Sequence, residues 1–362
     1  MKRSGCKSVI RLLFVQAVLI FSVSSLYAAD VDKQFKKEFD ASKVELLKIS
    51  NRYGDVEIVN SDNNKIIIVV DVQLSHPNSS KAEKLLSMIN VEFSESDNTA
   101  EARTVIDRQF SMDNRGPHRG FSINYRVEMP EGMNLDLSNR YGDFKAGNLS
   151  GHVDIRVKYG SLFIKNLTRG NQEPLNRITG EYLRVGDIAD AGWLELSIRY
   201  VGKFNILNAQ ALLIDSRYSN NNTIDNVSSV VIDSKYDRFE IHNLNNIVAE
   251  SAYTAYHLGN LSKKLDIEAK YGSIEVDNVE AGFEMVKTDV GYTPVKISFN
   301  ESASYKLRAE TRYCGFSFNE KDADILQRIQ ESNSMYLEAI IGNADTKSEV
   351  SIESNYGSVK LY

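Results

Sequence analysis

Basic residues recur immediately before a series of tyrosines, and they form the pattern in this chain that could support binding chemistry. The candidate surface stripe consists of Arg199, Arg217, Lys235, Lys270 and Arg312. The same position is basic in earlier copies, at Arg52, Arg140 and Lys158. If the copies stack in register, these side chains form a groove for an acidic polymer such as an envelope polysaccharide.

Acidic residues stand two positions before the basic ones and offer a second interpretation. They are Asp215, Asp233, Glu250, Glu268, Asp289, Glu310 and Glu353. Neighbouring rows of opposite charge would form ion pairs, each worth only a few tenths of a kcal/mol, and charged edges discourage aggregation. Because the rows run side by side and their charges largely cancel, the structural interpretation is favoured over a binding groove.

The tyrosines themselves occupy one position of the repeat in eleven copies. They are Tyr53, Tyr141, Tyr159, Tyr200, Tyr218, Tyr236, Tyr253, Tyr271, Tyr292, Tyr313 and Tyr356. An inward column would be a stack of core aromatics, whereas an outward column would resemble a platform for stacking sugars. The tyrosine has the same parity as the apolar residues two, four and six positions earlier, so the sequence predicts that the column points inward.

Other reactive residue types show no spacing typical of a catalytic or metal site. The five histidines, at 76, 118, 152, 242 and 257, lack metal-ligand spacing. No nucleophile elbow, phosphate loop or dinucleotide fingerprint is present, and no unique carboxylate pair stands out. Cys314 has no histidine nearby in sequence and is expected to be buried or inert. We therefore expect no catalytic residue, no metal and no cofactor.

The elements that position these residues are two short strands per repeat, clearest from Val230 to Val279. Apolar residues fall six, four and two positions before the tyrosine and three, five and eight after it, which is strand alternation with one phase shift. Most tyrosines are 17 to 21 residues apart. This period predicts an all-β fold, a parallel β-solenoid of about twelve coils that forms a rod roughly 55 Å long.

Three parts of the repeat region depart from the pattern or leave an alternative open. Thr179 and Ile341 fill the tyrosine position in two degenerate copies, and Glu320 to Ser332 inserts a polar, helix-compatible excursion. Tyr-Gly turns could also close antiparallel hairpins, but several copies lack the glycine. A row of asparagines marks a second corner and predicts hydrogen bonds from copy to copy. Its members are Asn148, Asn166, Asn226, Asn243, Asn260 and Asn278.

The N-terminal part divides into a signal peptide at residues 1–29 and a cap region at 30–133, before the repeat domain at 134–362. The cap contains the first repeat copy, a short helix near Ser80 to Met88, a strand pair at Val91 to Phe93 and Ala102 to Ile106, and a loop at Asp113 to Gly120. An atypical cap protects the unpaired end of a repeat array.

The signal peptide predicts the localisation of the protein. Residues 1–11 carry four basic residues, an apolar run follows, and small residues precede a cleavage site near Ala28 or Ala29. No later segment is apolar enough to span a membrane. After cleavage, 39 Lys and Arg face 49 Asp and Glu, a net charge of −10, which disfavours nucleic acid as a partner. Cys314 is then the sole cysteine, so no internal disulfide is expected.

The stretch from Leu135 to Phe144, LDLSNRYGDF, preceded by YRVEMP and followed by repeated Tyr-Gly-Ser segments, carries a family resemblance. It resembles the exported "putative adhesin" family of β-strand-repeat proteins of Bacteroidetes, over about residues 44 to 362. The resemblance implies a β-solenoid, a location in the periplasm or at the surface of a Gram-negative bacterium, and no known catalytic residues.

We therefore expect a non-enzymatic envelope protein that serves as an adhesin or interaction scaffold, with an envelope protein or a polysaccharide as its partner. Two alternatives remain. One is a periplasmic sensing or regulatory partner in envelope-stress signalling, because a solenoid offers strand edges and flat faces to proteins. The other is a carbohydrate-active enzyme on a β-helix, although most of the repeats are too short for the loops that such enzymes use.

Overall fold

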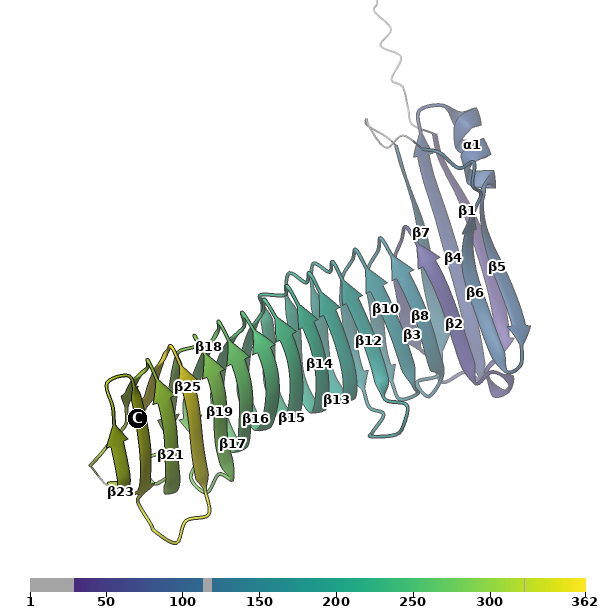
Figure 1. Ribbon diagram of the computed structural model, residues 1–362. Helices are drawn as coiled ribbons and strands as arrows, with labels where there is room; N and C mark the ends of the chain where they lie inside the picture. The colour runs from purple at the N-terminus through teal and green to yellow at the C-terminus, as the bar shows by residue number, and fades with distance from the viewer. Residues whose placement is uncertain (1–28, 113–118, 322) are drawn as a thin grey trace, which may run out of the picture.

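The computed structural model describes residues 29–112, 119–321 and 323–362, so residues 1–28 of the predicted signal peptide and most of the Asp113 to Gly120 loop lie outside the described residues. Within them the chain is all-β, as expected, with a single α-helix and one 3-10 turn. Figure 1 shows an elongated stack of strands with a taller end at the N-terminal side.

The cap and the first repeat contain the following elements: β1 (Ala29–Asp40), η1 (Ala41–Lys43), β2 (Leu46–Arg52), β3 (Val56–Asn60), β4 (Lys65–His76), α1 (Ser79–Ser87), β5 (Ile89–Ser96), β6 (Thr99–Ile106) and β7 (Gly120–Met129). The predicted helix is confirmed, and its N-cap is Asn78, whose side chain accepts from the N–H of Lys81. The predicted strand pair is confirmed as the antiparallel hairpin of β5 and β6.

The central repeats begin with pairs of short strands and continue as long strands: β8 (Asn134–Arg140), β9 (Phe144–Leu149), β10 (Val153–Lys158), β11 (Leu162–Leu167), β12 (Asn176–Glu181), β13 (Gly186–Arg199), β14 (Phe204–Arg217), β15 (Asn222–Lys235), β16 (Arg238–Ala252) and β17 (Ala255–Lys270). Successive copies pair in parallel and in register, so the antiparallel alternative does not describe how they stack.

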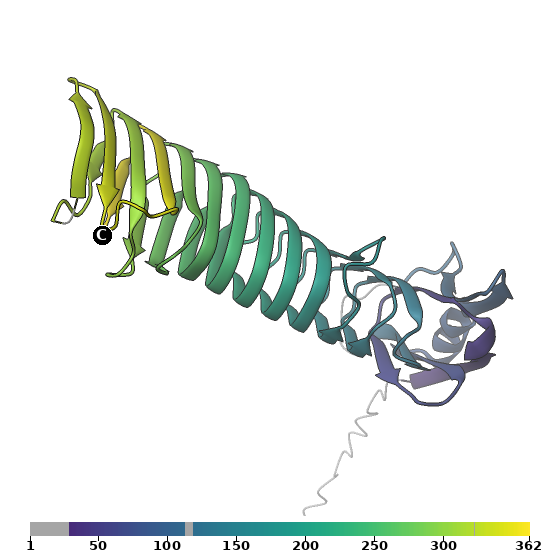
Figure 2. The ribbon, with the colours of Figure 1, turned by 90° about the horizontal axis from the view of Figure 1, so that it is seen from below.

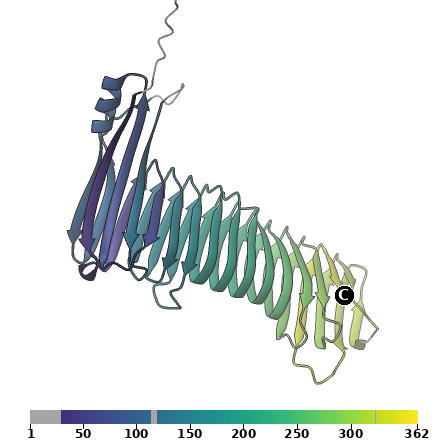
Figure 3. The ribbon, with the colours of Figure 1, turned by 180° about the vertical axis from the view of Figure 1, so that it is seen from behind.

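The C-terminal part comprises β18 (Ser273–Val279), β19 (Met285–Gly291), β20 (Val295–Phe299), β21 (Tyr305–Arg312), β22 (Gly315–Ser317), β23 (Ala323–Gln330), β24 (Ser334–Ile341), β25 (Glu349–Asn355) and β26 (Ser358–Leu361). Here the chain does not stack in sequence order. Strand β25 lies between β19 and β21, and strand β26 lies between β20 and β22. Figure 3 shows this last segment in yellow among the greener strands.

Two predictions for the C-terminal part are wrong. The Glu320 to Ser332 excursion contains a strand, β23, which is antiparallel to β24, and β24 in turn is antiparallel to β21. Ile341 therefore ends this hairpin and does not occupy a tyrosine position. With antiparallel strands at both ends, the long sheet is mostly parallel but mixed.

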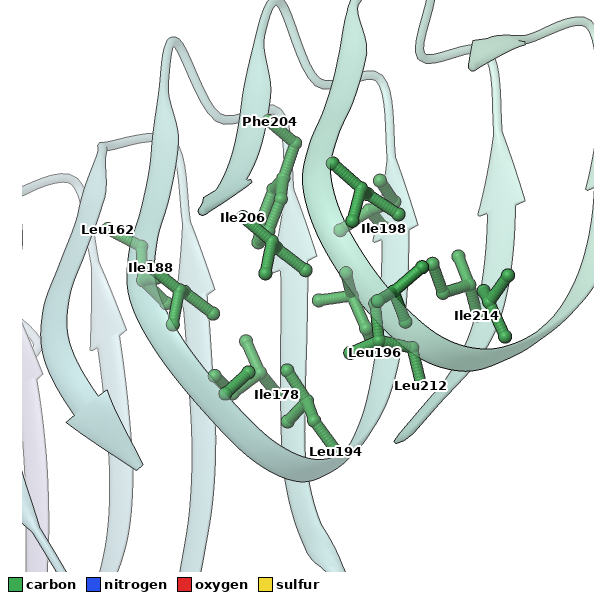
Figure 4. Close-up of a cluster of buried hydrophobic side chains, with 14 of the residues drawn as sticks. Leu162, Ile178, Ile188, Leu194, Leu196, Ile198, Phe204, Ile206, Leu212 and Ile214 are labelled. Atoms are coloured by element: carbon green, nitrogen blue, oxygen red, sulfur yellow. The ribbon is translucent and has the colours of Figure 1, made fainter. Parts of the chain in front are cut away.

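Each central repeat contributes to two faces that enclose one apolar core. One face consists of the segments that lead into the tyrosines, and we refer to it as the leading face; the opposite face consists of the segments that follow the tyrosines (Figure 2). Inward residues such as Ile188, Leu196, Ile206 and Leu212 fill the space between them (Figure 4). The predicted apolar positions on both sides of the tyrosine are buried, and their burial is the main source of stability.

The N-terminal end of this core is covered by the cap. Strands β1, β4 and β7 extend the opposite face, while β5 and β6 extend the leading face. Helix α1 contacts β1, β4 and β5 and buries Ala82 and Leu85 against the core. This arrangement keeps the first repeat from exposing its apolar interior.

Candidate functional site

The tyrosines lie on the outside of the molecule, so the predicted inward column is wrong. Twelve tyrosines have a positive φ and belong to this column, including Tyr182, which the sequence pattern missed in favour of Thr179. Their side chains are 37% to 57% exposed. Parity holds only while the backbone stays extended, and the left-handed residue at each corner turns its side chain outward. The buried residue at the corner is the next one, for example Ser219 or Asp237.

The tyrosine rings form one continuous stack, which we name the tyrosine ladder. Its order along the molecule is Tyr53, Tyr141, Tyr159, Tyr182, Tyr200, Tyr218, Tyr236, Tyr253, Tyr271, Tyr292, Tyr356 and Tyr313. Adjacent ring centroids are 4.7 to 5.1 Å apart, and the interplanar angles are 1° to 12°. Phe121 covers the free face of Tyr53.

This packing decides what the ladder offers to a ligand. Because almost every ring has neighbours on both faces, a sugar cannot stack on a ring face as it would on an isolated aromatic side chain. Ring edges and hydroxyl groups remain exposed, and no ladder hydroxyl hydrogen-bonds to another described residue. The ladder is thus a continuous row of phenol groups at about the spacing of β-strands.

Left-handed backbone at twelve non-glycine residues has an energetic cost that the stacking offsets. Such a residue costs roughly 1 kcal/mol or more, while an aromatic pair contributes about 0.5 to 1.5 kcal/mol. Guanidinium and ammonium groups add to the stack: Arg140 lies over Tyr141 and Tyr159, and Lys158 lies over Tyr159 and Tyr182. Ring stacking and these cation contacts together therefore offset much of the backbone cost.

The candidate basic stripe lies directly beside the ladder on the leading face. Strand register places Arg199, Arg217 and Lys235 next to one another, whereas Ala252 separates Lys235 from Lys270. Gly291 and Asn355 separate Lys270 from Arg312. The stripe thus contains one compact group of three and two isolated members.

Ion pairs engage part of this row. Arg217 contacts both Asp215 and Asp233, at 3.4 and 3.0 Å, and Lys158 contacts Glu181 at 2.5 Å. The hydrogen bond that Lys158 donates to Glu181 raises the pKa of Lys158. Arg199, Lys235, Lys270 and Arg312 form no ion pair with other described residues. The opposing charges therefore pair at some positions only.

The second corner of the repeat carries the asparagine row, and its predicted hydrogen bonds are confirmed. Amide groups bond from strand to strand at 2.8 to 3.2 Å along Asn208, Asn226, Asn243, Asn260 and Asn278 and between Asn148 and Asn166. Asp190 takes the asparagine position in β13 and accepts from Asn208 at 2.9 Å. A groove of about 670 Å³ follows this row, but its amides are largely engaged with each other.

Asp237 is a buried carboxyl group at a tyrosine corner. Its carboxylate accepts hydrogen bonds from the backbone N–H of Ser219 at 2.6 Å and from the hydroxyl of Ser234 at 2.8 Å. Burial raises its pKa, and the hydrogen bonds only partly oppose this. The equivalent residue in the preceding repeat, Ser219, accepts from the N–H of Val201 with its hydroxyl. A serine can therefore fill the Asp237 position and keep the bond.

Replacing Asp237 by serine is expected to flatten the pH dependence of stability. A carboxyl group with a raised folded-state pKa contributes fully below its unfolded pKa of about 3.9, and this contribution is lost as the pH rises through the folded value. Asp237→Ser should match the wild type near pH 4 and exceed its free energy of unfolding by about 1 to 2 kcal/mol near pH 8. Denaturation between pH 4 and 8 tests this, with the exposed Asp233→Ser as control. An unchanged pH profile would show that Asp237 does not titrate with folding.

Potential metal and membrane features are few. No group of three His, Cys, Asp or Glu residues in the described ranges could hold a metal ion. His257 contacts Asp277 at 2.9 Å, and His242 contacts Asp225 and Glu240. The partly buried thiol of Cys314 lies 3.4 Å from the Ser354 hydroxyl. Among the described residues, none of the helices has the length and apolarity needed to cross a bilayer.

Comparison with known proteins gives structural neighbours only. No family model matches, and no curated protein matches either. A "putative adhesin" from Bacteroides fragilis is 11% identical, with a TM-score of 0.33 and coverage of 91% of this chain and 97% of that one. A "putative adhesin" from Parabacteroides merdae is 12% identical, with a TM-score of 0.30 and coverage of 74% and 97%. A "putative lipid binding protein" from Parabacteroides distasonis is 12% identical, with a TM-score of 0.27 and coverage of 91% and 96%. Proteins named "putative adhesin" from Bacteroidetes, which the resemblance led us to expect, are thus among the structural neighbours.

Proposed function

We propose that the protein is a non-enzymatic scaffold or adhesin of the cell envelope, exported to the periplasm or cell surface. In this proposal residues 134–362 form a β-solenoid of about twelve coils together with the first copy near Tyr53, and residues 30–133 cap it. The observation that carries the proposal is the tyrosine ladder, a rigid row of twelve outward phenol groups flanked by basic side chains. Among the described residues, the repeated positions serve the packing of the core and of the ladder. We take this as support for a binding role over catalysis.

The ladder and the basic residues beside it suit an extended partner that contacts many repeats. Phenol hydroxyls donate and accept hydrogen bonds, and neighbouring Arg and Lys side chains attract carboxylate or phosphate groups. Each contact is weak, but a polymer that binds several equivalent positions gains by multivalency. An acidic envelope polysaccharide fits this description, so we assign it as the partner class.

Retention of the protein on immobilised acidic and neutral glycans tests the proposal. The test variant is the triple substitution Tyr200→Asn, Tyr218→Asn and Tyr236→Asn, because asparagine tolerates left-handed backbone and should leave the fold intact. The matched control changes the same repeats on the opposite face, with Asn205→Ala, Thr223→Ala and Glu240→Ala. We expect at least a tenfold loss of retention on acidic glycans for the ladder variant alone.

Two outcomes would contradict this function. Equal retention of both variants would show that the ladder takes no part in binding. Release of new reducing ends or unsaturated products, abolished by substitution of one carboxylate, would identify a carbohydrate-active enzyme. A pull-down from envelope extracts, carried out in parallel, separates glycan binding from a protein-partner role in stress signalling.

A further inference from the structure

The outward residues of the leading face form three parallel rows, and strand register fixes their order. The basic row, next to the ladder, reads Arg52, Arg140, Lys158, Glu181, Arg199, Arg217, Lys235, Ala252, Lys270, Gly291, Asn355 and Arg312. The acidic row, two residues earlier, reads Ser50, Ser138, Arg156, Thr179, Ser197, Asp215, Asp233, Glu250, Glu268, Asp289, Glu353 and Glu310.

These rows show that the charges do not cancel evenly along the face, contrary to the expectation from sequence. From β2 to β13 the acidic row contains no acid, so this half is net basic. From β16 to β21 every member of the acidic row is a carboxylate, while Ala252, Gly291 and Asn355 interrupt the basic row. A hollow of about 630 Å³ lies where Ala252 and Gly291 replace long side chains. The face is therefore basic at one end and acidic at the other.

The centre of the same face is apolar. A third row, two residues before the acidic row, places Leu213, Val231 and Val248 side by side on β14, β15 and β16. Their side chains are 44%, 46% and 39% exposed. Exposed branched residues on adjacent strands, with charged residues around them, are typical of an interaction surface.

We propose that the leading face is a self-association surface on which two copies pair antiparallel about a twofold axis. The axis runs parallel to the strands and passes between β14 and β15. It superimposes the basic half of each copy on the acidic half of the other. The face is self-complementary, as a twofold interface must be.

This axis makes specific residues face each other. It places Arg140 opposite Asn355, Lys158 opposite Gly291, Arg199 opposite Ala252, and Glu181 opposite Lys270 of the second copy. The first three pairs put a basic side chain over each position where the basic row is interrupted. Beside each interruption, two residues away on the same strand, stands a carboxylate: Glu353, Asp289 or Glu250. None of these three carboxylates forms an ion pair with another described residue.

The centre and the far ends complete the arrangement. Leu213 of one copy faces Val231 of the other, so the axis runs through the apolar patch. Arg217 faces Lys235, but Arg217 already contacts two carboxylates in its own chain. Arg52 faces Arg312, with Glu310 beside Arg312 on the same strand. Like charges thus meet at the centre and at the ends, whereas opposite charges meet at the four positions between them, and this pattern favours one orientation of the pair over others.

Sedimentation of the mature chain with charge-reversal variants tests the proposal. We expect a monomer–dimer equilibrium whose dissociation constant rises at least tenfold between 0.1 and 1 M salt, because salt screens the rim charges. The basic reversal, Arg140→Glu with Arg199→Glu, should raise it at least tenfold, and so should the acidic reversal, Glu250→Lys with Glu353→Lys. Combining all four changes restores each contact with the signs exchanged and should return the constant to within about threefold of the wild type.

The control and the orientation are tested separately. Lys145→Glu with Lys360→Glu makes the same charge change on the opposite face and should leave dimerisation unchanged. In a Cys314→Ser background, spin labels at Arg140→Cys should be about 40 to 45 Å apart and labels at Leu213→Cys about 10 to 15 Å apart, given the spacings of strands and sheets.

Three results would overturn the self-association surface. They are a monomer at all concentrations up to about 200 μM, a dimer that neither reversal weakens, and short label distances at both positions, which indicate parallel copies. None of them depends on glycan binding. The envelope ligand can therefore fail while the dimer stands, and the reverse also holds.

Discussion

Replacing Phe239 by alanine will lower the free energy of unfolding by about 3 to 5 kcal/mol, whereas replacing Tyr236, three residues earlier, will lower it by about 1 to 2 kcal/mol. Phe239 is 1% exposed and packs its ring 5.9 Å from that of Tyr256 in the core. Its removal leaves a cavity between the leading face and the opposite face. Tyr236 is 42% exposed, so its removal costs mainly two ring contacts, at 5.0 and 4.7 Å.

Denaturant unfolding of both variants, with hydrogen exchange at β15 and β16, measures this contrast. Exchange is needed because a long repeat array need not unfold in a single step. Lys235→Ala is the matched control beside Tyr236 and should cost about 0 to 1 kcal/mol. A larger cost for Tyr236 than for Phe239 would show that the ladder, and not the interior, dominates stability.

Sequence reasoning recovered the interior of the repeats because strand alternation is local. Val230, Ile232 and Ile241 are buried where the pattern placed them. The same alternation failed at the tyrosines, since a left-handed residue ends the extended backbone on which parity depends. The asparagine row was predictable for the converse reason: an amide at a repeated corner has its own copy as the nearest partner.

The strand order at the ends of the molecule could not be predicted from the sequence, because it depends on pairing between distant segments. Tyr356 follows Tyr313 in sequence but lies between Tyr292 and Tyr313 in the stack. Likewise, β23 is a strand only because β24 pairs with it, although its sequence is polar enough to suggest a helix. The charge asymmetry of the leading face also emerged only from register, because it depends on Asn355 lying between Gly291 and Arg312.

The sequence pattern predicted the row of the candidate stripe correctly but not the grouping of its residues. Its residues do share one row, as the spacing implied, but three of its five members are contiguous and two are isolated. The tyrosines beside it were assigned to the core and instead provide the exposed groups of the candidate site. The repeated tyrosine-glycine pair could have indicated that the tyrosines point outward, because this pair is typical of a tight corner.

Two kinds of tyrosine corner explain why glycine follows some tyrosines and not others. At the first kind, an aspartate two residues after the tyrosine binds the next repeat: Asp55 accepts from the N–H of Asp143, and Asp143 accepts from that of Ser161, both at 2.8 Å. At the second kind, the residue directly after the tyrosine accepts from the preceding repeat: Ser219 accepts from the N–H of Val201, and Asp237 accepts from that of Ser219. At the first kind of corner, the glycine after the tyrosine lies against the backbone of a neighbouring repeat, as Gly142 lies against Gly54.

Substituting Gly160 by alanine will therefore cost about 3 kcal/mol or more, because the new Cβ would lie 2.0 Å from the carbonyl oxygen of Gly142. Backbone in a stacked sheet cannot move aside as a flexible side chain can, so the corner must separate from its neighbour or lose its hydrogen bonds. Gly170→Ala is the control: nothing lies within 4 Å of its added Cβ, and its effect should stay within about 0.5 kcal/mol.

The two glycine variants are compared by denaturant unfolding and by near-ultraviolet circular dichroism, which reports the ordered stacking of Tyr141, Tyr159 and Tyr182. Gly160→Ala should reduce the tyrosine signal as well as the stability, because Gly160 directly follows a ladder residue. If Gly160→Ala proves as mild as Gly170→Ala, the corner can change to the second kind. The hydrogen bond that the Ser161 N–H donates to Asp143, and not the close backbone approach, would then be what holds these repeats in register.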